Sequence, residues 1–198
     1  MELQTLIFLG PSGSGKGTQT QLLKQYIEEH DLVYPIFALE TGAAFRNFIK
    51  GDSYSSQIER DVMARGIRAP DFLAIYLWAE LLVKDFTHND QHFLIDGSPR
   101  SLTEAVALKT AMEFYQRRKP TVVHFSASRE WSVSLMSERG RLDDTIEDIH
   151  KRLDWYERDV VPAVDFYRND PLFTFVEINA EQPIEAVHRD IIEKLALV

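Results

Sequence analysis

The sequence predicts an α/β fold in which a parallel sheet of five strands carries helices on both faces. Five short apolar runs alternate along the chain with longer segments whose apolar residues recur at helical spacing. This alternation is typical of parallel sheets, because each connection between parallel strands lays a helix against the sheet. The first run ends at a glycine and reads as a strand that is buried on both faces. The expected strands are Thr5–Leu9, Pro35–Leu39, Gln91–Ile95, Thr121–Phe125 and Phe173–Ile178.

The segments between and after these strands predict helices. Asp144-Thr145, followed by Glu147 and Asp148, predicts a capped start for a long helix that continues to about Arg168. Four aromatic residues lie on apolar faces and are expected in the core: Trp78, Phe86, Trp155 and Tyr156. The other expected helices are Gly15–His30, Thr41–Ile49, Tyr54–Ala64, Phe72–Phe86, Ser101–Gln116, Trp131–Met136 and Pro183–Leu195.

Composition predicts a single globular domain, residues 1–198, located in the cytoplasm. Hydrophobic residues make up 44% of the 198 positions, which provides enough apolar surface to offset the entropy of a disordered chain. The first residues, Met1–Thr5, lack the basic-then-apolar pattern of a signal peptide. No apolar run approaches the roughly 20 residues of a membrane helix.

Charge and cysteine content disfavour several classes of function. The chain has 22 basic and 31 acidic residues, so its formal net charge is −9. A general binder of nucleic-acid polymers needs a basic face, and a protein that binds membranes electrostatically needs basic clusters, so we expect neither class. Because the chain contains no cysteine, it forms no disulfide and holds no zinc through thiolates.

Clustered glycines localise the function. Four of the nine glycines fall within eight residues, directly after the first expected strand: Gly10, Gly13, Gly15 and Gly17. The segment Gly10–Lys16 has the form G-x-x-x-x-G-K and precedes an expected helix, which is the context of a phosphate-binding loop. Glycines let backbone N–H groups converge on phosphate oxygens, while the helix N-terminus and Lys16 add positive charge. A simple glycine-rich turn is the weaker interpretation, because the lysine is present and all seven positions are in register.

The residues after the lysine narrow the class further. A serine or threonine usually follows this lysine and helps to hold Mg²⁺, whereas here Gly17 follows and Thr18 comes next. The sequence Gly-Lys-Gly-Thr-Gln resembles the adenylate kinase family of nucleoside monophosphate kinases. Other segments resemble that family in the expected order: Thr41–Arg46 (T-G-D-x-x-R), Gly66–Asp71, Asp96–Arg100 (D-G-[FY]-P-R), Gly140–Asp144 (G-R-x-D-D), Lys151–Tyr156 and Pro162–Tyr167. The resemblance covers nearly the whole chain. It implies a three-layer P-loop NTPase fold, with a helical nucleoside monophosphate (NMP)-binding excursion at 41–70 and a very short lid at 137–144.

Phosphoryl transfer between two nucleotides explains why arginines recur in these segments. The reaction brings two polyanions together, and the attacking monophosphate oxygen is already ionised, so catalysis rests on positioning and charge neutralisation. Planar guanidinium groups match phosphate oxygens bidentately. By resemblance, the catalytic residues are Lys16, Arg100, Arg141, Arg152 and Asp96.

The resemblance also implies individual roles and two ligands, ATP and an NMP. Lys16 bridges the β- and γ-phosphates, Arg46 and Arg100 hold the acceptor phosphate, and Arg141 and Arg152 reach the transferred group. Asp96 and Thr18 hold Mg²⁺, Asp96 through water, and no zinc is expected. The implied ATP-binding set is Gly13, Ser14, Gly15, Lys16, Gly17, Thr18, Arg139, Ala180 and Gln182. The implied NMP-binding set is Thr41, Gly42, Arg46, Ala69, Gly97, Arg100, Glu104, Arg141 and Arg152. Taken alone, Arg46 or Arg152 could be a surface charge, and Asp96 could cap a helix.

The expected lid departs from the family pattern. Only six residues separate Met136 from Asp143, which is shorter than is usual in the family. The positions of two lid arginines hold Ser134 and Glu138, and Arg139 is the nearest substitute for one of them. A preference for ATP over GTP therefore remains open.

The expected acceptor site also departs from the family pattern. The aspartate, aromatic residue and glutamine of the family pattern are here Ala43, Ser98 and Glu104. An ionised carboxylate offers only acceptors, which suits guanine N1–H and N2–H₂, whereas adenine requires one donor and one acceptor. Two hypotheses remain open: either Glu104 disfavours AMP, or it swings into solvent or pairs with Arg46 and leaves AMP as the substrate.

Three functions are compatible with the sequence. The leading one is a nucleoside monophosphate kinase, favoured as a monomer, that transfers the γ-phosphate of ATP to AMP or another NMP. A second is a P-loop kinase whose acceptor is a nucleoside or other small alcohol; it needs a carboxylate base, for which Asp96 is the candidate. The third is a nucleotide-binding regulatory protein with weak catalysis, which the trimmed lid suggests.

Overall fold

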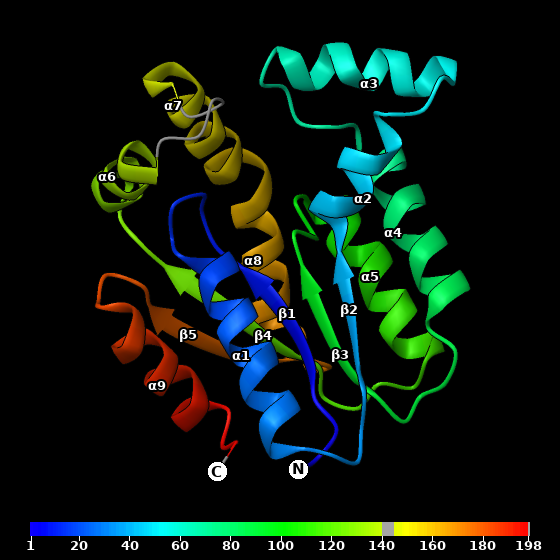
Figure 1. The fold of residues 1–198 in the computed structure, drawn as a ribbon, viewed down its shortest axis with the longest axis vertical. Helices are drawn as coiled ribbons and strands as arrows, with labels where there is room; N and C mark the ends of the chain where they lie inside the picture. The colour runs from blue at the N-terminus through cyan, green and yellow to red at the C-terminus, as the bar shows by residue number, and fades with distance from the viewer. Residues whose placement is uncertain (140–144, 198) are drawn as a thin grey trace.

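The computed structural model of the chain describes residues 1–139 and 145–197 (Figure 1). It confirms the predicted sheet: five strands, all paired in parallel, follow the order β2-β3-β1-β4-β5. Strand β1 therefore lies in the middle, and the segments that follow β1 and β3 leave the same edge of the sheet side by side. The strands are β1 (Thr5–Leu9), β2 (Ile36–Glu40), β3 (His92–Asp96), β4 (Thr121–Ser126) and β5 (Thr174–Asn179).

The helices largely follow the sequence prediction, with two corrections. The sixth helix, expected over Trp131–Met136, extends over Arg129–Arg139. Apolar spacing missed its ends because the residues there are polar and mostly exposed. The expected long helix is interrupted by a π-helical segment, η1 (Tyr156–Val160), and Pro162, which lacks an N–H to donate, stands at the start of the next helix. The α-helices are α1 (Lys16–His30), α2 (Thr41–Phe48), α3 (Tyr54–Ala64), α4 (Asp71–Asp85), α5 (Leu102–Phe114), α6 (Arg129–Arg139), α7 (Ile146–Trp155), α8 (Val161–Asn169) and α9 (Ile184–Lys194).

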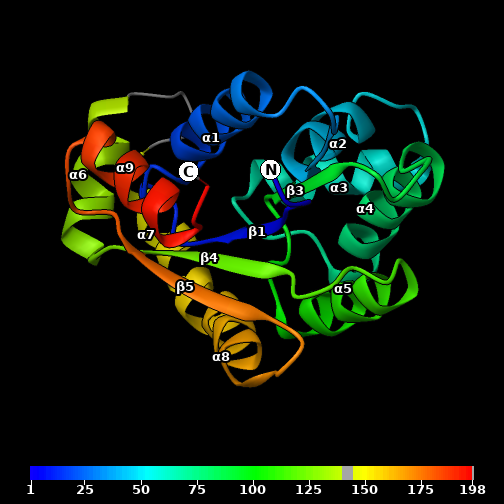
Figure 2. The ribbon, with the colours of Figure 1, turned by 90° about the horizontal axis from the view of Figure 1, so that it is seen from below.

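Helices cover both faces of the sheet, as predicted, and each face has its own core (Figure 2). On β1, Ile7 and Leu9 point into a cluster with α4, α5 and α8, whereas Leu6 and Phe8 point into a cluster with α1 and α9. This alternation follows from the period of two along a strand. All five residues of β1 are buried, which explains why the run of residues is apolar rather than alternating.

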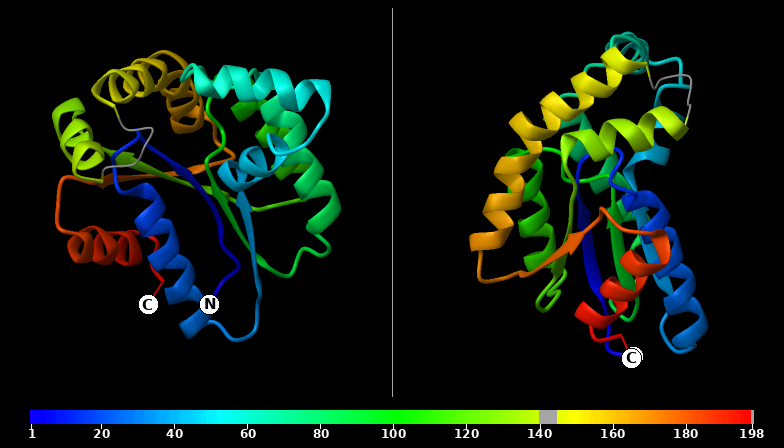
Figure 3. Two further views of the ribbon diagram at one scale, coloured as in Figure 1. Left: turned by 45° about the horizontal axis from the view of Figure 1, so that its top comes forward. Right: turned by 90° about the vertical axis from the view of Figure 1, so that its left-hand side faces the viewer.

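Two helical projections stand over the carboxyl edge of the sheet (Figures 1 and 3). One consists of α2 and α3, within the expected excursion at 41–70, and it packs on α4 through Phe45 and Leu77. The other consists of α6 and α7, which pack together through Met136, Ile149 and Leu153. Of the lid expected at 137–144, the first three residues form the end of α6, and the rest lie outside the described residues.

Local capping fixes where the helices near the cavity begin. Ser101 accepts a hydrogen bond from the Glu104 amide at the start of α5, and Thr145 accepts one from the Asp148 amide at the start of α7. The Thr145 cap confirms the helix start that was predicted there. Within residues 1–139 and 145–197, no helix is both long and apolar enough to cross a membrane.

Candidate active site

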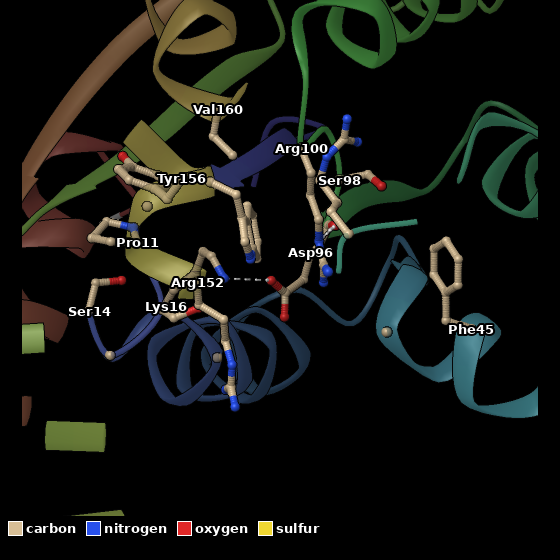
Figure 4. Close-up of a pocket in the computed structure, with 18 of the residues that line it drawn as sticks. Pro11, Ser14, Lys16, Phe45, Asp96, Ser98, Arg100, Arg152, Tyr156 and Val160 are labelled. Carbon is tan, nitrogen blue, oxygen red and sulfur yellow. Dashed lines mark hydrogen bonds and ion pairs between the residues drawn. The ribbon is translucent and has the colours of Figure 1, made fainter. Parts of the chain in front are cut away.

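A cavity of about 1110 Å³ opens at the carboxyl edge of the sheet, between the two helical projections (Figure 4). Ligands of open parallel sheets bind at this edge, beyond the ends of the strands. The loop after β1 forms one side, and Phe45 of α2 lies on the other. In Figure 4, Asp96, Ser98 and Arg100, from the segment after β3, lie between these two sides.

The loop between β1 and α1 has the backbone that its glycines predict. Gly13 and Gly15 have φ values of 82° and 73°, in the left-handed region that favours glycine. A Cβ atom at Gly13 would also collide with the backbone of Ser132, because α6 packs closely on the loop. The hydroxyl oxygen of Ser14 is buried and has no hydrogen-bond partner among the described residues. Helix α1 begins at Lys16, so its positive N-terminal end faces the loop.

Lys16 and Asp96 meet where β1 and β3 end. Lys16 Nζ lies 3.5 Å from Asp96 Oδ1, and both residues line the cavity. Asp96 does not cap the following helix, because the Ser101 side chain performs that role. Asp96 Oδ1 is buried and accepts no hydrogen bond from the described residues, so the ion pair with Lys16 is the contact that a metal ion or phosphate would have to replace there.

The turn after Asp96 joins the two expected acceptor segments. The Thr41 hydroxyl donates a hydrogen bond to the Asp96 carbonyl at 3.2 Å, and Arg100 Nε donates one to the Gly97 carbonyl at 2.7 Å. Gly97 has a φ of 88°, and a Cβ there would lie 2.5 Å from Thr41 Oγ1. Only glycine fits this turn, which brings Arg100 to the start of α2.

Arg100 is held in the wall of the cavity beneath Trp155. Its guanidinium carbon lies 6.0 Å from the centroid of the Trp155 ring, a cation–π contact. Burial lowers the pKa of Arg100 from its ordinary value, and the nearby carboxylates Glu104 and Asp96 oppose that shift. The guanidinium therefore offers a desolvated positive charge to a ligand.

Two aromatic residues that were expected in the core also line the cavity. Trp155 and Tyr156 are half-buried: they pack against the core on one side and border the cavity on the other. For these two residues the core prediction is incomplete, because apolar spacing on a helix does not distinguish a core from the wall of a cavity. Trp78 and Phe86 are buried in the core, as predicted.

Glu104 faces the same cavity, deeply buried. Only 1% of the residue is exposed, and its carboxylate accepts a hydrogen bond from the Ser98 hydroxyl at 3.1 Å. Arg68 Nη1 lies 3.4 Å from the other carboxylate oxygen. The hypothesis that Glu104 swings into solvent or pairs with Arg46 is therefore wrong, because α5 directs the side chain inward to Arg68. Burial raises the pKa of the Glu104 carboxyl, while Arg100, the Ser98 hydroxyl and Arg68 oppose this shift.

The structure brings most of the remaining sequence-predicted residues to the cavity. Arg46 is exposed and lines the cavity beside Gly42, where an added Cβ would lie 3.3 Å from Arg46 Nη1. Other predicted residues that line it are Gly13, Ser14, Gly15, Gly17, Thr18, Ala69, Arg139 and Arg152. Ala180 and Gln182 do not line it: Ala180 is buried in the core, and the Gln182 amide bonds to Asn179 and Asp190. Arg141 lies outside the described residues.

Sequence reasoning missed two charged residues of this wall. Arg68 belongs to the turn between α3 and α4 and pairs with Asp71 at 2.8 Å as well as with Glu104 and Asp159. Glu59 of α3 is 1% exposed and lines the cavity, and its Oε1 has no hydrogen-bond partner among the described residues. Arg68 lies in the Gly66–Asp71 segment that resembles the family, but the resemblance assigned it no role, and Glu59 lies in no motif. The position of both residues within the expected excursion at 41–70 was the available signal.

This geometry defines a class of protein. A glycine loop at a helix N-terminus, an adjacent lysine–carboxylate pair and arginines facing the same cavity are the parts of a phosphate-loop phosphotransferase that acts on nucleotides.

Comparisons with known proteins support that class and identify the family. The family model described as adenylate kinase matches residues 8–171. An adenylate kinase of Prochlorococcus marinus (strain AS9601) is 30% identical, covering 96% of this chain and 98% of its own. An adenylate kinase of Synechococcus sp. (strain WH7803) is 33% identical, covering 93% and 94%. Adenylate kinase 1 of Nostoc sp. (strain PCC 7120) is 31% identical, covering 94% and 95%.

The chain belongs to the adenylate kinase family. It is a phosphotransferase of the nucleoside monophosphate kinase class, as the sequence predicted.

Proposed function

We propose that the chain transfers the γ-phosphate of MgATP to an NMP within this cavity, with Lys16, Asp96 and Arg100 at the point of transfer. The observation that carries the proposal is their convergence: Lys16 faces Asp96 at 3.5 Å, and Arg100 is bonded to the adjacent Gly97 carbonyl at 2.7 Å. These groups come from the ends of two neighbouring parallel strands, where a phosphoryl group can contact all of them.

The donor phosphates would bind the loop between β1 and α1. Its glycines expose backbone N–H groups. The Ser14 hydroxyl, which has no hydrogen-bond partner among the described residues, would supply another polar contact. Lys16 would exchange its Asp96 partner for the β- and γ-phosphate oxygens. Arg139 and Arg152, which line the same cavity, would neutralise charge on the transferred group.

The acceptor phosphate would bind Arg100 and Arg46. Since an ionised phosphate attacks directly, the reaction requires no strong general base. An alcohol acceptor would require a carboxylate base, and the candidate Asp96 is already paired with a lysine. The site therefore favours a phosphate acceptor over the small-alcohol alternative.

The residues present fit a magnesium ion that is held mainly by substrate. Asp96 Oδ1 is a buried oxygen without a hydrogen bond, and Thr18 lines the same cavity. No cluster of three metal-ligating side chains occurs within residues 1–139 and 145–197. Mg²⁺ commonly binds through one or two protein ligands together with waters and phosphates, which matches this sparse set. When bound, Mg²⁺ would neutralise negative charge on the ATP phosphates.

We further propose that the chain acts as a cytoplasmic monomer. Every residue assigned above comes from a single chain, so no second copy is needed to complete the site. Light scattering at several protein concentrations, with and without ATP, tests this proposal, and a stable dimer under both conditions would contradict it.

A coupled assay of nucleoside diphosphate formation tests the central proposal. Purified chain is mixed with MgATP and each of AMP, GMP, CMP and UMP, and Arg100→Met serves as the variant at the transfer point. We expect turnover with at least one monophosphate and a fall of about a hundredfold or more in Arg100→Met, because a charge-stabilising contact is lost. ATP binding without any turnover would instead support a nucleotide-binding regulatory protein.

A further inference from the structure

Glu104, Arg68 and Ser98 form a polar cluster in the acceptor part of the cavity. All three line it, and in Figure 4 Ser98 lies on the opposite side of Asp96 and Arg100 from the phosphate loop. The Ser98 hydroxyl donates to one carboxylate oxygen of Glu104 at 3.1 Å, and Arg68 Nη1 lies 3.4 Å from the other. Buried polar groups of this kind serve binding specificity when they line a ligand pocket.

Apolar side chains line the same cavity. They come from α3, from the turn after it and from α4: Met63, Ala64, Ile67, Ala69 and Ala74. An aromatic base whose phosphate is held by Arg100 could lay its faces against these side chains and turn one edge to the polar cluster. The wall thus has the composition of a nucleobase pocket, apolar with a few placed polar groups.

We propose that the acceptor base is guanine, read by Glu104 and Arg68. This inference rests on the proposed function, since it assumes that the acceptor is an NMP. The ionised carboxylate of Glu104 would accept hydrogen bonds from guanine N1–H and N2–H₂, and Arg68 would donate to O6. Ser98 orients the carboxylate through its hydroxyl. Arg68, whose Nη1 lies 3.4 Å from the carboxylate, and the nearby Arg100 both favour the ionised form and oppose the rise in the pKa of Glu104 that burial causes.

The other bases fit this edge less well. Adenine and cytosine each place a ring-nitrogen lone pair next to their amino group, and that lone pair would face a carboxylate oxygen. Uracil offers one N–H between two carbonyls, so one carboxylate oxygen would meet a carbonyl. Guanine has two adjacent donors and a carbonyl beside them, which matches a carboxylate next to a guanidinium. A site built to receive hydrogen bonds discriminates strongly against a ligand that cannot donate them.

Two measurements on the same variants test the inference. Calorimetry without ATP gives the affinity of the chain for GMP, AMP, CMP and UMP, and the coupled assay gives kcat/KM for each. We expect both the affinity and kcat/KM for GMP to exceed those for AMP by about tenfold or more, because the carboxylate makes a bidentate contact with guanine alone.

The variants test which residue is responsible. In Glu104→Gln, the ratio of GMP to AMP in each quantity should fall at least about tenfold. Glu113→Gln is the matched control, since it removes an exposed carboxylate from the same helix α5 and should leave the ratio unchanged.

Arg68→Met is a second variant in case Glu104→Gln fails to fold. It removes the donor for guanine O6 and should also lower the ratio of GMP to AMP, about tenfold. Equal or tighter binding of AMP, CMP or UMP by the unmodified chain would overturn the inference. So would a GMP to AMP ratio that neither variant changes.

The outcomes separate this inference from the function on which it rests. Selective binding of GMP without phosphoryl transfer would overturn the proposed function and leave the base assignment standing. Transfer to AMP without selectivity for GMP would support the proposed function and overturn the base assignment.

Discussion

Lys16 Nζ lies 3.5 Å from Asp96 Oδ1, so the cation of the phosphate loop faces the carboxylate at the end of the neighbouring strand. The two side chains are 22% and 29% exposed, which places the pair in contact with solvent. Ion pairs at such positions contribute between zero and about 1 kcal/mol to stability. This weak pairing leaves Lys16 available to phosphates at little energetic cost. Its removal should therefore affect function much more than folding.

Replacing Lys16 with methionine separates these two effects. We expect kcat to fall by about a hundredfold or more, because a positive charge that stabilises the transferred phosphoryl group is lost. The free energy of unfolding should change by less than about 1 kcal/mol. The coupled assay measures the first quantity and urea denaturation the second.

Lys84→Met is the matched control for this variant. Lys84 is exposed near the end of α4 and does not line the cavity, so its removal changes the net charge equally without touching the site. Its kcat should stay within about twofold of the unmodified chain, since exposed charges contribute little. A comparable loss of turnover in both variants would show that overall charge, rather than Lys16, is responsible.

Replacing Asp96 with asparagine should weaken the use of magnesium. The amide keeps the shape of the side chain but removes the charge that would attract Mg²⁺ to the strand end. We expect the Mg²⁺ concentration for half-maximal rate to rise about tenfold or more, with partial recovery at high Mg²⁺. Asp85→Asn, at an exposed position, is the control. A lowered rate with an unchanged Mg²⁺ dependence would argue that Asp96 only positions Lys16.

Alanine substitutions at two glycines of the phosphate loop distinguish the effect of backbone strain on stability from the effect of packing. Gly13 and Gly15 both have positive φ, but a Cβ at Gly15 would have no atom within 4 Å, whereas one at Gly13 would collide with Ser132. Gly15→Ala should therefore lower the free energy of unfolding by about 1–2 kcal/mol through backbone strain alone. Gly13→Ala should lower it further, because α6 must move away from the loop.

Urea denaturation of the two variants, with Gly17→Ala as control, checks this prediction. Gly17 lies within α1, has no positive φ and would meet no atom within 4 Å, so alanine there should be neutral or slightly stabilising. Equal destabilisation at Gly13 and Gly15 would mean that α6 does not constrain the loop.

Local sequence determined what could be predicted here. The apolar run Thr5–Leu9, the glycines after it and the helical spacing beyond them encode one strand–loop–helix unit, and the structure forms that unit at the predicted residues. The two departures among the helices also have local causes that apolar spacing alone does not reveal: Pro162 after η1 and the polar residues at the ends of α6.

The acceptor wall could not be predicted in the same way. Arg68 and Glu104 are 36 residues apart, and their contact depends on how the turn between α3 and α4 packs against α5. Trp155 illustrates the same limit, because it packs against the core and also makes the cation–π contact with Arg100. Such contacts arise from tertiary packing, which a motif does not encode.

The buried side chains of His92 and Asp31, at the end of the sheet away from the cavity, make the free energy of unfolding depend on pH. His92 Nδ1 accepts a hydrogen bond from the Gln4 amide at 3.0 Å, and Nε2 donates one to Asp31 at 3.1 Å, so the ring is neutral. Burial lowers the pKa of His92, although Asp31 opposes this shift. The pKa of Asp31 is lowered to about 2, mainly by the hydrogen bond from the Val33 amide, with further help from Tyr34 and His92.

Both shifts stabilise the fold at neutral pH and lose that effect as the pH falls. Below about pH 6.5 the unfolded chain protonates its histidine while the folded chain does not, so the unfolded state binds more protons. We expect the free energy of unfolding to decrease from pH 7 to pH 5, with His92 contributing up to about 1.4 kcal/mol per pH unit. Asp31 adds a second loss of stability as the pH falls from its ordinary pKa of 3.8 to about 2.

In His92→Gln the decrease in the free energy of unfolding between pH 7 and 5, measured by urea denaturation, should be smaller. His88→Gln, at an exposed position, should match the unmodified chain. An unchanged slope in His92→Gln would mean that His92 takes up its proton equally in the folded and unfolded states.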